Sequence, residues 1–143
     1  LRYAPDATVW FEEVQWTQGA LPPPRPVRLG TVRGCPPAPA SAEDHLAWYG
    51  EQIDALLPSS PDLILLPEFA NVASMPAAAG TELLDRAEAL PGRFCCMLAE
   101  RAREANCYMA AGVLEREGDI IYNSAVLLDR TGDLVGVQRK VHP

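Results

Sequence analysis

The chain has 143 residues with 48% hydrophobic and 22% charged residues, a size and composition typical of about one globular domain. Its formal net charge is −7, and its twelve basic residues are scattered among nineteen acidic ones, which argues against nucleic acid as a partner. No window approaches the ~18–20 apolar residues of a membrane span, and the first residues lack the apolar core of a signal peptide.

The N-terminal segment divides into two parts. Within residues 1–20, the stretch 8–16 mixes aromatic and β-branched side chains with acids, a pattern typical of a half-buried strand. Residues 21–26 contain four prolines, which favour an extended polyproline segment that serves as a semi-rigid spacer. We therefore expect residues 1–20 to be the tail of an upstream β-domain, 21–26 a linker, and 27–143 a second domain.

The second domain opens with a predicted β-α-β unit. Residues 27–32 form a short β-rich run, and Ser41 with Asp44 resembles a capping box that begins a helix. Pro58 and Pro61 end this helix, and residues 62–66 form the next strand. Two strands joined through a helix are expected to be parallel.

The rest of the chain predicts two helices and an antiparallel meander. After a loop at 69–80 we expect a short helix at 81–89, and a one-sided pattern predicts a longer helix from Pro91-Gly92 to about Asn106. The remaining elements are predicted as a strand at 107–114, a hairpin turn at 115–119, a strand at 120–128, a turn at 129–133 and a strand at 134–138. Because the run 63–66 is continuously apolar, we expect an α/β sheet covered on both faces, partly by sequence outside this chain.

Glu68 is the first candidate for chemistry. It follows a buried strand at the carboxyl edge, where open α/β sheets place their sites. Pro67 and Phe69 flank it, so we expect partial desolvation that raises its pKa toward a value useful for a general base. Taken alone, the residue is more often an ordinary solvated acid at the end of a strand, and the other motifs are what favour a catalytic role.

The other polar candidates carry weaker signals. The cysteines lack the spacings of zinc or redox sites, so we expect most of them to be buried, with Cys35 the one nearest the carboxyl edge. Asn123 and Ser124 either orient a site or satisfy neighbouring backbone groups, and the second is the commoner role in a strand. The two histidines lie too far apart to form a metal constellation, and we predict neither a metal nor an organic cofactor.

Three stretches together resemble the nitrilase, or carbon-nitrogen hydrolase, superfamily. Residues 27–33 look like its first strand, and 62–69 look like its Pro-Glu motif. Residues 122–136, running into 139–143, look like its lysine motif. The resemblance covers residues 27–143.

The resemblance implies a fold, an activity and site residues. The fold would be the N-terminal part of a four-layer αββα sandwich, and the reaction would be hydrolysis of non-peptide C–N bonds in a small amide or nitrile. The family uses a Glu-Lys-Cys triad. Its Glu falls on Glu68, as general base, and its Lys falls on Lys140, as oxyanion stabiliser. The family's nucleophilic cysteine and a further acid follow its lysine and have no counterpart in this chain, so we expect the 143 residues alone to be inactive. Arg139 is left with a structural or solvent-facing role. Family members commonly form homo-oligomers, so a homo-oligomer is one expectation.

Two other readings stay open. The first is a non-catalytic α/β binding or interaction module with a nitrilase-like fold. The second rests on residues 7–16, which resemble the closing strand of jelly-roll carbohydrate-binding modules and would make sugar binding the main activity.

Overall fold

A computed structural model describes residues 12–13, 15, 19, 21, 23–39, 41–74 and 81–141. The strand expected at 8–16 falls mostly outside these described residues. In chain order the elements are β1 (Leu29–Thr31), α1 (Ala42–Asp54), a 3₁₀ turn η1 (Leu57–Ser59), β2 (Leu63–Leu65), α2 (Thr81–Arg86), α3 (Arg93–Ala105), β3 (Tyr108–Glu117), β4 (Ile120–Leu128) and β5 (Leu134–Arg139).

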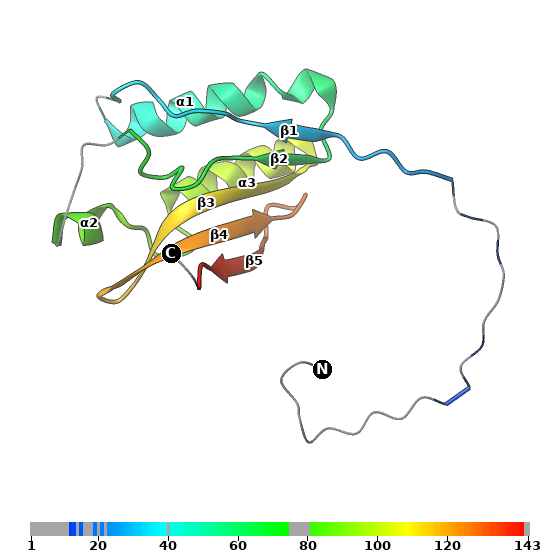
Figure 1. The fold of residues 1–143 in the computed structure, drawn as a ribbon. Coiled ribbons are helices and arrows are strands. Elements are labelled where there is room, and N and C mark those ends of the chain that lie inside the picture. Colours follow the sequence, from blue (N-terminus) through cyan, green and yellow to red (C-terminus); the bar gives the residue numbers. More distant parts are fainter. Residues whose placement is uncertain are drawn as a thin grey trace.

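The strands form one five-stranded sheet in the order β1-β2-β3-β4-β5 (Figure 1). β1 pairs in parallel with β2, and β2 pairs in parallel with β3. β3 pairs antiparallel with β4, which in turn pairs antiparallel with β5. This confirms the predicted α/β fold, with a parallel first half and an antiparallel second half.

Helices α1 and α3 pack against each other and supply the core on one face of the sheet. The Ser41 hydroxyl accepts a hydrogen bond from the Asp44 amide (3.0 Å), so the predicted cap of α1 is confirmed. Asn106 ends α3 in the left-handed conformation, with φ of 49°. Among the described residues no helix has the length and apolar character needed to cross a membrane.

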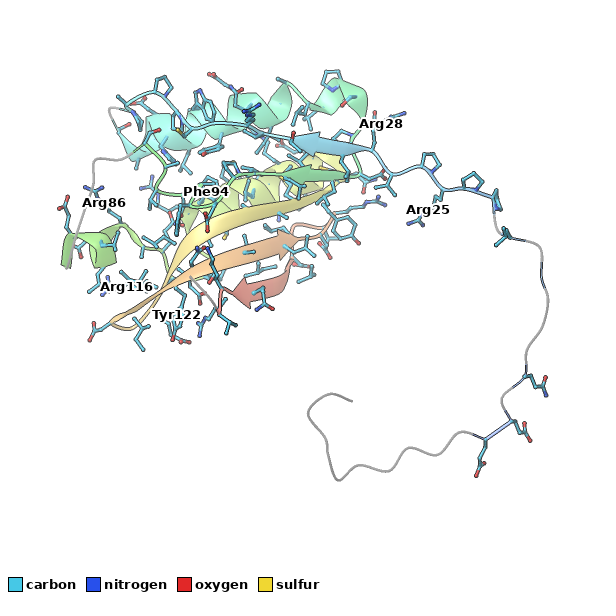
Figure 2. All side chains as sticks on the ribbon, in the orientation of Figure 1. Arg25, Arg28, Arg86, Phe94, Arg116 and Tyr122 are labelled. Atoms are coloured by element: carbon cyan, nitrogen blue, oxygen red, sulfur yellow. The ribbon has the colours of Figure 1, made fainter. Side chains whose placement is uncertain are left out.

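The core lies between these helices and the sheet. The buried side chains recur with the period of each element, which places them on the faces that meet. In α1 they include Tyr49 and Ile53, which are one turn apart. Phe94, labelled in Figure 2, is buried on α3 and contacts Tyr49 edge to face, with ring centroids 5.4 Å apart. Met109 and Val126 contribute from β3 and β4.

The opposite face of the sheet remains apolar and open in the described part of the chain. Leu29, Leu65, Tyr108 and Leu127 lie on this open face by strand register, and each is 36% exposed or more. The described residues do not form the layer that we expected over this second face.

The hairpin between β3 and β4 lies further along the chain than predicted. We expected a turn at residues 115–119, but Glu117 pairs with Ile120, so the loop consists of Gly118 and Asp119. Gly118 adopts φ of +60°, as two-residue hairpin loops require. Consequently Glu115 is a strand residue, and it is 5% exposed.

The turn that follows β2 packs directly on β3. The amide of Gly112 donates to the Pro67 carbonyl (3.1 Å), and the amide of Ala70 donates to the Gly112 carbonyl (2.8 Å). A Cβ atom on Gly112 would lie 2.6 Å from the Cα of Glu68, a separation that real Cβ atoms essentially never show. Glycine at position 112 is therefore what allows the turn to lie this close to the sheet.

We expect Gly112→Ala to lower the free energy of unfolding by about 1–3 kcal/mol, because the new methyl group forces the turn away from β3. Gly136→Ala is the matched control, since its Cβ would meet nothing closer than the Cβ of Leu127 at 3.6 Å. The control should change stability by less than about 0.5 kcal/mol. Urea unfolding of both variants measures the difference, and equal stabilities would contradict the close approach.

Candidate active site

Glu68 lies in the turn beyond the carboxyl end of β2, where the sequence placed it. Asn71, two residues past Phe69, fixes this turn to β3: its side-chain amide donates to the carbonyl of Leu114 (3.1 Å), and its side-chain oxygen accepts from the amide of Leu114 (2.8 Å). Phe69 adopts φ of +55°, a strained conformation for a residue with a bulky side chain. The turn keeps this conformation because backbone and side-chain hydrogen bonds hold both of its ends.

His45 supports the same turn from the helical layer. Its imidazole is 1% exposed, and Nε2 lies 2.6 Å from the carbonyl oxygen of Ala70. A carbonyl oxygen only accepts hydrogen bonds, so Nε2 carries the proton in this contact. The histidine that offered no metal constellation in the sequence therefore has a structural contact two residues from Glu68.

The structure brings Glu68 and Lys140 together. The Nζ atom of Lys140 lies 3.2 Å from Oε1 of Glu68, although the two residues are 72 positions apart in the chain. β5 delivers the lysine, because the backbone amide of Lys140 donates to the carbonyl of Asn123 on β4 (2.8 Å). Both sequence candidates thus belong to one constellation at one end of the sheet.

Asn123 is the third member of this constellation. Its Nδ2 donates to the same Oε1 atom of Glu68 at 2.7 Å. The sequence favoured a backbone partner for Asn123, and that choice was wrong. The orientation of Asn123 could have been predicted from the alternation of side chains along β4. Odd-numbered residues of this strand face away from buried Val126 and Leu128, so Asn123 faces the open side.

The expectation that Glu68 is desolvated is also wrong for the described residues. Its side chain is 56% exposed, and hydrogen bonds from Asn123 and Lys140, followed by the charge of Lys140, hold its pKa below the ordinary value. Pro67 and Phe69 precede and follow it in sequence without covering the carboxylate. Glu68 is therefore an ionised, paired carboxylate at neutral pH.

A second ion pair lies on the helix-covered face of the same sheet. Arg139 contacts both carboxylate oxygens of Glu115 and stacks on the ring of Tyr122 with 3.7 Å from Cζ to the centroid. Ser124 donates its hydroxyl to Glu115 (2.5 Å). Of the structural and solvent-facing roles left open for Arg139, its contacts with Glu115 favour the structural one. Glu115 was missed because the sequence placed it in a turn.

The cysteines divide into two groups. Cys95 and Cys107 are buried as expected, while Cys35 and Cys96 are exposed. Burial raises the pKa of the Cys95 thiol to about 11 and also raises that of Cys107, so neither readily forms the thiolate that acts as a nucleophile. None of the contacts of Glu68 or Lys140 within the described residues involves a cysteine.

Comparison with known proteins identifies relatives of this chain. A protein-family model described as carbon-nitrogen hydrolase matches residues 31–143. "Nitrilase 3" from an unknown prokaryotic organism is 39% identical over 67 residues, which are 45% of this chain and 20% of that protein. A nitrilase from Pyrococcus abyssi is 37% identical over 62 residues, which are 43% of this chain and 23% of that protein.

A solved structure shows the same fold. It is an amidase from Nesterenkonia sp. AN1, a double mutant in which a glutamate and a cysteine are replaced, in complex with acrylamide. The TM-score is 0.63 at 18% sequence identity, and the match covers 87% of this chain and 46% of the amidase. The chain therefore matches less than half the length of each of these relatives.

We expect Asn123→Ala to raise the pKa of Glu68, because this variant removes the hydrogen bond that lowers the pKa most. Carboxyl-detected NMR titration of the Glu68 side chain measures the shift. Gln138→Ala is the control, since that amide donates to the carbonyl of Arg139 and not to Glu68. An unchanged pKa in Asn123→Ala would show that the contact with Asn123 does not stabilise the carboxylate.

Proposed function

Because the chain belongs to the carbon-nitrogen hydrolase family, we propose that the whole protein hydrolyses a non-peptide C–N bond with Glu68 as general base and Lys140 as oxyanion stabiliser. The single observation that carries these two roles is the 3.2 Å contact between Lys140 Nζ and Glu68 Oε1. Two residues 72 positions apart meet at the sheet edge where α/β folds place chemistry.

The proposed base meets the first requirement of its role. A general base must be ionised before it accepts a proton, and the lowered pKa keeps Glu68 ionised at neutral pH. Asn123 holds Oε1 from a strand and leaves Oε2 without a hydrogen bond from Asn123 or Lys140, so this oxygen is the one that we assign to proton transfer. Backbone hydrogen bonds of Gly112 with Pro67 and Ala70 hold the turn that carries Glu68 against β3, which favours a fixed reaction geometry.

Lys140 is suited to the second role because its ammonium group carries three donors and contacts Glu68 through one of them. When a nucleophile adds to an amide carbonyl, negative charge develops on the oxygen atom. An ammonium ion already in place stabilises this charge without reorganisation, which is a large source of catalysis in acyl transfer.

The proposed nucleophile is a thiol. Glu68 takes the thiol proton, and sulfur bonds to the amide or nitrile carbon. With an amide, the protonated Glu68 returns the proton to the nitrogen, the C–N bond breaks, and ammonia or an amine leaves a thioester. With a nitrile, the proton passes to the nitrogen to give a thioimidate, and a water molecule adds to its carbon before ammonia leaves and the thioester remains. Water activated by Glu68 then cleaves the thioester to release a carboxylic acid and the thiol. The named relative with acrylamide bound carries substitutions at one glutamate and one cysteine, which supports this pairing of groups.

The substrate class follows from the same sources. The relatives are named as nitrilases and as an amidase, and we extend to this protein a small molecule with an amide or a nitrile group. Amides and nitriles both present an electrophilic carbon to a thiol and a heteroatom that gains negative charge or a proton. A base paired with an ammonium ion serves either one.

In the whole protein, Lys140→Met is expected to lower kcat about 10²–10³-fold, the usual loss when one oxyanion donor is removed. Glu68→Gln should abolish detectable turnover of simple amides and nitriles, because glutamine accepts no proton. Glu51→Gln removes an exposed carboxylate of α1 and should stay within about twofold of the unaltered protein. Ammonia release measures all three. Activity that survives Glu68→Gln would exclude the mechanism, whereas no turnover by the unaltered whole protein would favour a non-catalytic binding module.

The 143-residue chain by itself should show no turnover, since its buried thiols have raised pKa values and none of the contacts described for Glu68 involves a cysteine. The measurement is ammonia release from this chain beside that from the longer protein. Turnover by the short chain that is lost in Cys35→Ser would move the nucleophile to Cys35.

A further inference from the structure

The helix-covered face of the sheet carries a buried charged cluster close to the proposed site. The Glu115 side chain is 7% exposed, and Nη2 of Arg139 lies 2.5 Å from its Oε1. Arg139 Nε is 3.2 Å from each oxygen of the same carboxylate. The Ser124 hydroxyl donates to Oε2, so the carboxylate is held by partners on two other strands.

This cluster joins three strands at one point. Glu115 belongs to β3, Ser124 to β4 and Arg139 to β5, and Ser124 and Arg139 are register partners. Tyr122, labelled in Figure 2 near the start of β4, lies under the guanidinium group. An arginine fork that meets a carboxylate in this way is directionally specific as well as strong.

Among the described strands, the strand that carries Arg139 is paired on one side only. Within the described sheet β5 is an edge strand that pairs with β4 alone, and its register with β4 is irregular at Leu127 and Leu128. Lys140 follows Arg139 directly, and successive side chains of an extended strand point to opposite faces. Arg139 is therefore anchored on the covered face, while Lys140 reaches Glu68 on the open face.

We propose that Glu115 is a positioning residue: its buried carboxylate clamps Arg139, and this clamp holds the end of β5 where Lys140 contacts Glu68. The inference rests on the proposed function of Glu68 and Lys140. Glu115 does not touch the reacting atoms, because it lies on the other face of the sheet. Its contribution is to the position of Lys140, and a displacement of about 1 Å at such a group is costly in catalysis.

Glu117 provides a matched control. It also pairs with Arg139, through Nη1 at 3.1 Å, but its side chain is 64% exposed. An exposed pair of this kind contributes little, because water competes for both charges. The clamp assigned to Glu115 therefore predicts different behaviour for two glutamates that share one arginine.

The test compares Glu115→Gln and Glu117→Gln in the whole protein, well below the unfolding temperature of each. Glu115→Gln should lower kcat on the order of 10–100-fold with KM changed less than about twofold, because Lys140 is misplaced while position 115 itself lies on the opposite face of the sheet from the proposed site. The acidic limb of the kcat/KM profile should move to higher pH, since a displaced Lys140 no longer lowers the pKa of Glu68. Glu117→Gln should match the unaltered protein in all three quantities.

A purely structural pair would lower thermal stability and leave kcat and the acidic limb unchanged, and that result would overturn the proposal. If Glu115→Gln does not fold, Arg139→Lys replaces it, because lysine keeps a positive charge against the buried carboxylate but lacks the fork and the stacking on Tyr122. A shifted acidic limb in Arg139→Lys supports the clamp, and an unshifted one rejects it. Glu68→Gln and Lys140→Met are assayed in parallel. If both match the unaltered protein, the proposed function fails. If both lose activity as predicted above and Glu115→Gln behaves like Glu117→Gln, only the clamp fails.

Discussion

The register of β3 is the constraint on which the rest of the site depends. β3 pairs in parallel with β2 and antiparallel with β4, so it fixes where the end of the parallel half lies relative to the meander. Gly112 on this strand receives the turn that carries Glu68, and two residues on, Leu114 is the partner of Asn123. A slip of one residue would turn every side chain to the other face and separate the carboxylate from both of its partners.

The ion pairs on the two faces of the sheet differ in how far they are exposed to solvent. On the open face, the pair between Glu68 and Lys140 is about half exposed on both sides, so it stabilises the fold little and leaves both groups accessible. On the covered face, Glu115 is almost fully buried and its charge must be compensated, because an unpaired buried carboxylate is strongly unfavourable. Arg139 and Lys140 are neighbours in sequence and serve the two faces separately. One backbone segment thereby combines a rigid contact with an accessible one.

The sequence predicted the elements well where local chemistry determines them. Pro58 and Pro61 interrupt a helix, and Ser41 caps it, whatever the rest of the molecule does. Features that depend on long-range packing could not be predicted from local sequence. Glu115 looked like part of a charged turn, because charge and a nearby glycine are turn signals, and its burial follows only from partners on two other strands. The environment of Glu68 was misjudged for the same reason: sequence neighbours do not reveal which groups from β4 and β5 reach a side chain.

The open face of the sheet bears on how a carboxylate with a lowered pKa acts as a base. Leu29, Leu65, Tyr108 and Leu127 expose apolar surface on the same side as Glu68, and apolar surface of this kind favours cover by another layer. Any layer that excludes water there acts on Glu68 in two opposing ways. Desolvation raises its pKa, while the hydrogen bonds from Asn123 and Lys140 strengthen as the local dielectric falls and lower it. The proton affinity of the base is therefore set by the balance between burial and the two donors: the hydrogen bond from Asn123 lowers the pKa most, and Lys140 adds a second hydrogen bond and the attraction of a full charge.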